Sequence, residues 1–147
     1  MPIYGKFLGV CVGGYAASDS YAVDILSDTI KVALCTSTYT PDQDAHVFFS
    51  DVTNEITGTG YTAGGQALAN KTLTYNASTN VTTFTADNTT WSSSTLTARY
   101  AVIYKSTGTA STSPLIAYID FGSNQSSSNG NFTIQWNASG IVGWTAN

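Results

Sequence analysis

The chain has 147 residues, of which only 10% are charged, and its formal net charge is −4. The five cations (Lys6, Lys31, Lys71, Arg99 and Lys105) are scattered, whereas a surface that follows phosphates needs clustered Lys and Arg, so nucleic-acid binding is not expected. No segment approaches the roughly 18–20 apolar residues of a membrane-spanning helix, so no membrane partner is expected either.

Residues 1–27 have no clear periodicity. Their apolar positions fit either a strand or a short helix, but glycines at 5, 9, 13 and 14 oppose a stable helix. The apolar run at 7–12 is short and flanked by glycine, so we do not expect a secretion signal. We therefore predict an irregular N-terminal arm or edge segment over 1–27 and one β-domain over 28–147.

Clear strand patterns begin after residue 28. Ile30, Val32 and Leu34 alternate along 29–35, which predicts a half-buried strand. Residues 36–46 have the composition of a loop, and 47–52 form a short apolar segment. The run ITGTGYTAGGQ at 56–66 predicts a glycine-rich turn region.

The clearest hairpin follows at 71–86. Leu73 and Tyr75 alternate in KTLTY, NASTN at 76–80 is rich in turn-forming residues, and VTTFTA at 81–86 is the returning strand. The loop expected next, at 87–94, surrounds Trp91.

The longest predicted strand covers 96–105 and is apolar on both faces in its middle, which is typical of a central strand. A turn at 106–113 and a strand at 114–121 follow it, and SNQSSSNGN at 123–131 has the composition of a flexible loop. Two last strands are predicted at 132–136 and 140–144. About eight short strands separated by turns indicate an all-β fold, an antiparallel sandwich or barrel of jelly-roll-like form.

Catalytic and metal-binding patterns are weak. His46 is the only histidine, it lies in a loop, and no GxSxG motif surrounds any serine, so the chain is not expected to be an enzyme. Cys11 and Cys35 lack CxxC spacing and are interpreted as small buried hydrophobic residues, although the spacing does not decide whether they pair. Asp42, Asp44 and Asp51 do not match the EF-hand spacing for calcium. No metal or cofactor is expected.

A resemblance gives the chain a more specific interpretation. The segments 27–46, 50–75, 84–105, 113–122 and 129–141 resemble a group of small structural proteins from tailed bacteriophages. The distinctive order is a TIKVAL strand, an EITGTGYTAGGQ loop, a strand ending TARYAVIYK, and then PLIAYIDFG. Residues 1–27 depart from this pattern.

The resemblance implies a virion component made in the host bacterial cytoplasm and placed on the capsid surface. Its role would be that of a capsid decoration, cement or minor capsid protein that binds the major capsid protein and stabilises neighbouring subunits. By analogy with capsid symmetry it would be a homo-oligomer, and a trimer would match three-fold sites. Two alternatives stay open: a tail, neck or fibre component, and a β-sandwich that binds host glycans through exposed aromatic residues.

Aromatic residues near loops are the candidate interface anchors, because Trp and Tyr dominate binding hot spots. An equally good interpretation of each is that it packs beneath its own loop. The candidates are Tyr15, Tyr39, Tyr61, Trp91 and Trp144.

Overall fold

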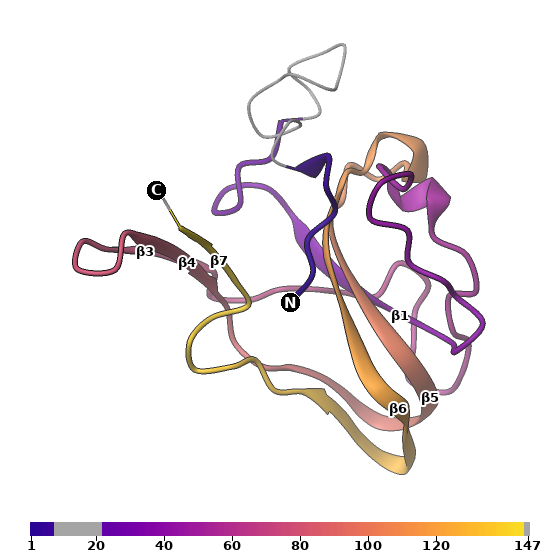
Figure 1. The fold of residues 1–147 in the computed structure, drawn as a ribbon. Coiled ribbons are helices and arrows are strands. Elements are labelled where there is room, and N and C mark those ends of the chain that lie inside the picture. The colour runs from indigo at the N-terminus through magenta and orange to yellow at the C-terminus, as the bar shows by residue number, and fades with distance from the viewer. Residues whose placement is uncertain (8–21, 146–147) are drawn as a thin grey trace.

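The computed structural model describes residues 1–7 and 22–145, and these form two antiparallel sheets (Figure 1). The first sheet has the strand order β2-β1-β5-β6 and the second has the order β3-β4-β7. Neither sheet closes into a barrel, so of the two predicted all-β architectures the sandwich is the one observed. The strands are β1 (Ile30–Cys35), β2 (Gln66–Ala67), β3 (Thr72–Asn76), β4 (Val81–Thr85), β5 (Thr89–Lys105), β6 (Leu115–Ile134) and β7 (Val142–Thr145).

Strand β5 is central, as its sequence predicts. It pairs with β1 on one side and with β6 on the other, and its middle is buried on both faces. Ile103 belongs to the core cluster that also contains Phe84 of the second sheet. Val102 faces the other way, into a smaller cluster rich in tyrosine. Two layers of apolar contact therefore hold the middle of the four-stranded sheet.

Strands β5 and β6 form one long ribbon that bends as a unit (Figure 1). Its register runs from Tyr104 opposite Leu115 to Thr89 opposite Ile134, with four irregularities that allow the bend. The loop predicted at 87–94 is wrong from residue 89 on, and the flexible loop predicted at 123–131 is wrong throughout, because both segments belong to this ribbon.

The Ser-rich composition misled those two predictions because the serines bond across the ribbon. Ser94 is fully buried, and its hydroxyl donates to the Trp91 carbonyl at 2.9 Å and lies 2.8 Å from the Ser127 hydroxyl. Buried hydroxyls with partners are compatible with a strand, so turn-forming residue types did not produce a turn here.

Smaller differences lie at the ends of elements. The apolar segment 47–52 contains a short 3₁₀ helix, η2 (Phe49–Asp51), and a second one, η3 (Ala110–Thr112), lies in the predicted turn at 106–113. Strand β6 ends at Ile134, and β7 begins two residues later than the predicted 140–144. The predicted hairpin at 71–86 is confirmed, with Asn76 paired to Val81 at its tip.

The described part of segment 1–27 packs on the first sheet. Ile3 bridges Ala117 of β6, and the Tyr4 amide donates to the Ile116 carbonyl at 3.1 Å. Tyr4, Phe7 and Ile25 are buried. Residues 8–21, with Cys11 and Tyr15, lie outside the described residues, and the division into an arm and a domain stays a prediction.

Candidate docking surfaces

The β3–β4 hairpin extends away from the body of the molecule (Figure 1). Leu73 of β3 lies opposite Phe84 of β4, which in turn lies opposite Val142 of β7. Residues directly opposite one another project from the same face of a sheet, so these three form one apolar row. Phe84 and Val142 are buried in the core, whereas Leu73 is 44% exposed. The apolar face of this sheet therefore continues past the core that covers it.

Tyr75 continues the same exposed face. It lies two residues after Leu73, so both side chains point the same way, and it is 58% exposed. Its hydroxyl donates to the Asn80 side chain at 2.9 Å, across the hairpin tip. The tip is itself fixed, because the Asn76 side chain accepts bonds from two loop amides and Asn80 takes a positive φ of 54°. The exposed apolar side chains are thus carried on an ordered hairpin.

The open edge of β3 is the second feature of this hairpin. All five β3 residues are exposed, and among the described residues β3 pairs with β4 and with no other strand. Its sequence TLTYN carries no charge, no proline and no irregular pairing with β4. Charged side chains, prolines and bulges are the features by which proteins usually block an exposed strand edge. Because β3 has none of them, it is open to pairing with another strand.

The edge of β6 differs along its length. Near its start, residues 2–4 and 47–48 lie against it, with the Leu115 amide donating to the Val47 carbonyl at 2.8 Å and the Tyr118 amide donating to the Pro2 carbonyl at 3.1 Å. Beyond Tyr118, no backbone segment among the described residues is bonded to that edge. A hollow lies beside this bent part of β6.

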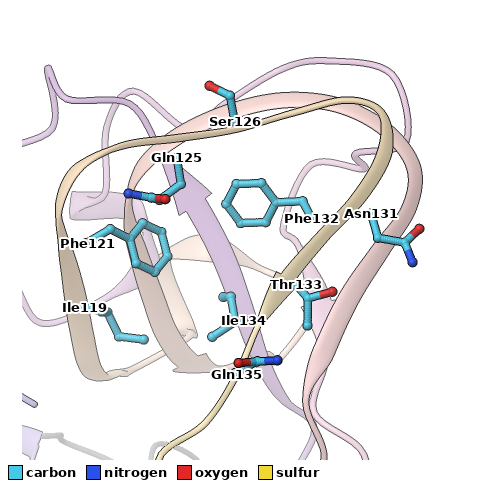
Figure 2. Close-up of a pocket in the computed structure, with 9 residues that line it drawn as sticks. All are labelled: Ile119, Phe121, Gln125, Ser126, Asn131, Phe132, Thr133, Ile134 and Gln135. Atoms are coloured by element: carbon cyan, nitrogen blue, oxygen red, sulfur yellow. The ribbon is translucent and has the colours of Figure 1, made fainter.

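Figure 2 shows this hollow inside the arch of β6, with the rings of Phe121 and Phe132 directed into it. The two ring centroids are 6.3 Å apart. The hollow has a volume of about 460 Å³, and an adjoining one of about 610 Å³ shares Ile119 and Gln135 with it. Side-chain amides, including Gln125, line the first hollow beside the rings, and no charged side chain lines it. Such a groove suits an uncharged, partly apolar ligand.

The glycine-rich segment 56–66 is held in place by one carboxylate. Glu55 Oε1 accepts bonds of 2.6 Å from the Tyr61 hydroxyl and from the Gly64 amide. The Tyr61 hydroxyl also accepts the Leu34 amide at 2.9 Å, which ties the loop to β1. Gly65 takes a φ of 68°, and a β-carbon there would lie 1.9 Å from the Val32 carbonyl oxygen. The segment is a packed connection against β1, in line with its predicted turn.

The interface candidates that the structure describes differ in exposure. Tyr39 and Trp91 are each 1% exposed, so both pack within their own chain. Tyr61 is half-buried beside Glu55, and Trp144 is half-buried with its ring 6.0 Å from that of Phe7. Their positions do not test whether these residues bind another protein, so that role stays a prediction.

Several tyrosine hydroxyls have pKa values well above the ordinary value for tyrosine. Tyr39 Oη lies 2.8 Å from Tyr4 Oη and 3.2 Å from His46 Nδ1. Burial raises the pKa of Tyr39 and of Tyr104 to about 12, and burial with a hydrogen bond to Glu55 raises the pKa of Tyr61 far above its usual range. Burial likewise raises the pKa of the free Cys35 thiol to about 12, which opposes thiolate chemistry.

Two of the aspartates considered for calcium, Asp42 and Asp51, accept backbone amides of their own turns. Asp42 accepts the amides of Asp44 and Ala45 at 3.0 and 2.9 Å, and Asp51 accepts the amides of Val47 and Phe48 at 2.8 and 2.9 Å. The hydrogen bonds from the Ala45 and Asp44 amides lower the pKa of Asp42. Within residues 1–7 and 22–145, no group of three or more His, Cys, Asp or Glu is placed to hold a metal ion.

Leu73 and Tyr75 were not among the predicted interface residues. Their alternation predicts a strand with one covered face, and the sequence does not say that the second layer ends before β3. One signal was present: β3 has only two apolar residues and leads into a polar turn.

Comparisons of the chain with protein-family models, with curated proteins and with solved structures found no match. No helix of the described residues is long and apolar enough to cross a membrane.

Proposed function

We propose that the chain is a structural protein of a tailed-phage virion, a capsid decoration or cement protein that binds neighbouring major capsid subunits. One observation carries the docking part of this proposal: an ordered hairpin presents an uncharged strand edge with its apolar face uncovered at Leu73 and Tyr75. Exposed apolar surface of this kind marks sites of protein contact. The resemblance of segments within 27–141 to phage structural proteins supports the virion part.

The composition supports the same role. A cement protein remains in a crowded lattice, where dense like charges on neighbouring copies would repel one another. With 10% charged residues and a surface rich in Ser, Thr and Asn, the chain avoids that repulsion. The well-covered four-stranded sheet supplies a rigid body on which docking surfaces can keep their geometry.

Cryo-electron microscopy of purified particles of the phage that encodes the chain tests the proposal. The expected result is density for this fold on the capsid lattice, at three-fold or quasi-three-fold positions, in many copies per particle. A matched pair of variants, Tyr75→Asp in β3 and Thr97→Asp on the outer face of β5, sharpens the test, since Thr97 is exposed away from the hairpin. Only the Tyr75 variant should be depleted from particles.

Two results would contradict the proposal. Density confined to the tail, neck or fibres would replace it with the alternative of a tail component. Absence of the chain from purified particles, measured by quantitative mass spectrometry, would exclude a virion role of either kind.

Glycan recognition is a second candidate, favoured by the hollow under β6. Aromatic rings beside amide side chains, as with Phe121, Gln125 and Gln135, offer an apolar face for a sugar ring and partners for its hydroxyls. Titration calorimetry with a panel of neutral oligosaccharides tests it, with Gln135→Ala as the matched variant. Binding that this variant abolishes would support the candidate, and no binding by any of them would exclude it.

A further inference from the structure

We infer that the open edge of β3 pairs with the β3 strand of a second copy of this chain, joining two three-stranded sheets into one six-stranded sheet. This inference concerns the chain itself and holds whether or not the virion role does: the second copy takes the backbone edge of β3, and the apolar face of Leu73 and Tyr75 stays available to a capsid subunit. Its basis is the self-complementary order of the side chains in β3.

Antiparallel pairing of two β3 strands about Thr74 produces a closed set of partners. Thr72 then lies opposite Asn76 of the second copy, and Leu73 lies opposite Tyr75, so that the leucine–tyrosine pair occurs twice by symmetry. Leu73 opposite Tyr75 brings two apolar side chains together, and the polar Thr72 and Asn76 side chains meet on the other face. Apolar side chains meet on one face and polar side chains on the other in this register.

The same register joins the two apolar faces. The row Val142, Phe84 and Leu73 of one copy continues into Tyr75 of the other, which pairs with Thr82 and so reaches Trp144. The side chains of Leu73 and Tyr75 therefore contact one another along their flanks, on both sides of the symmetry axis. A one-residue slip would place each apolar side chain on the polar face of the other copy, which disfavours it. Among the registers that keep the faces aligned, the one centred on Thr74 is the one that pairs all five residues of β3.

Charge also favours a second copy as the partner. Residues 72–80 carry no ionisable side chain except Tyr75, so two approaching hairpins have no like charges to separate. The nearest cation along the chain, Lys71, is half-buried and donates from Nζ to the Asp28 carbonyl, which keeps it bonded within its own copy. A charged partner would find no complementary group on this edge.

The size of the contact limits its strength. A pair of five-residue strands is much smaller than the roughly 1,200–2,000 Å² of a stable interface, so the free chain should dimerise weakly. Copies held close together on one assembly would pair more fully, because a high local concentration favours a weak contact.

Covalent trapping tests the register. Two Cα atoms directly opposite in an antiparallel pair are about 4.5–5.5 Å apart, within the range of a disulfide. Thr74→Cys in a Cys11→Ser background should form a disulfide-linked dimer in mild oxidant, with each thiol losing its proton and the oxidant taking up the two electrons. Cys35 is buried and does not compete.

Thr72→Cys in the same background is the matched control. The side chain at position 72 projects from the same face as that at position 74, but in the centred register the two copies of position 72 lie four residues apart along the strands, roughly 13 Å. Dimer yield at position 74 well above that at position 72 supports the inference. Equal yields at both positions, or none at either, would overturn it.

Sedimentation equilibrium over a range of concentrations gives an independent test without cysteines. Thr74→Lys places two ammonium groups opposite one another and should weaken dimerisation by about tenfold or more, whereas Thr97→Lys on β5 should leave it unchanged. A wild-type chain that stays monomeric at every concentration, or a Thr74→Lys chain that dimerises like wild type, would overturn the inference.

Discussion

The four-stranded and three-stranded sheets are both antiparallel, yet they differ in how far they are covered. In the first sheet the middle of β5 is buried on both faces, and residues 2–4 and 47–48 lie against the start of β6. In the second, Phe84 of β4 and Val142 of β7 are buried in the core, while β3 is exposed along its length.

Leu73 and Phe84 show what the difference teaches. They lie opposite one another, on one face, with Phe84 fully buried and Leu73 44% exposed. The sequences of β3 and β4 make both residues part of a hairpin. Which of the two is buried depends on how far the core beneath the sheet extends. The same molecule thus has one sheet whose middle is covered on both faces and one sheet whose outer strand is uncovered.

The largest effect is expected where the two sheets meet. Phe84→Ala should lower the free energy of unfolding by about 3–5 kcal/mol, because it leaves a cavity in the core that joins the sheets. Urea unfolding measures this. A loss below about 1 kcal/mol would mean that the second sheet is not packed on the first as described.

The next largest effect is expected at alkaline pH, which should lower the free energy of unfolding through the tyrosine-rich face of the first sheet. The pKa values of Tyr39 and Tyr104 are raised from 10.0 to about 12, so the folded state holds these protons after the unfolded state has lost them. Stability from these groups is therefore complete below pH 10 and falls as the pH rises from 10 to 12.

Urea unfolding at a series of alkaline pH values checks that sign. Tyr39→Phe, which removes one of the titrating hydroxyls, should make the fall with pH less steep. A stability that rises between pH 10 and 12 would contradict the burial of these side chains.

Removing one hydroxyl from the glycine-rich segment should have a moderate effect. Tyr61→Phe leaves Glu55 without one donor and the Leu34 amide without its acceptor, which should cost about 1–3 kcal/mol. Tyr75→Phe is the matched control, because its hydroxyl bonds only Asn80 at an exposed tip. Equal losses from both variants, measured by thermal or urea unfolding, would contradict the anchoring role of Glu55.

The smallest effect is expected at the open edge. Leu73→Ala should change the free energy of unfolding by no more than about 0.5 kcal/mol, measured in dilute solution, because much of the side chain already faces solvent. A loss comparable with that of Phe84→Ala would show that β3 is covered within its own chain.

The sequence predicted well those elements whose residues define them locally. The apolar middle of 96–105 indicated a central strand, and the Asn and Ser residues at 76–80 indicated the hairpin turn, where the Asn76 side chain caps the loop. The glycines of 56–66 indicated a tight connection, which Gly65 makes by approaching β1. In each case the residue type meets a local physical requirement.

The elements that were missed depend on distant partners. Residues 123–131 resemble a loop in composition, but they pair with β5 through irregularities that the composition does not reveal. Ser94 resembles a turn residue, yet two of its partners, Ser127 and Gly130, are more than thirty residues away. The exposure of Leu73 and Tyr75 likewise follows from where the second layer ends, a property of the whole fold.

Hydrogen–deuterium exchange at low and high protein concentration tests the contrast between the two sheets most directly. In dilute solution the amides of β1 and β5 should exchange slowly, and those amides of β3 that point away from β4 should exchange fast. At high concentration β3 alone should gain protection, as its edge pairs with a second copy. Slow exchange of all β3 amides in dilute solution, or no gain at β3 on concentration, would contradict the account.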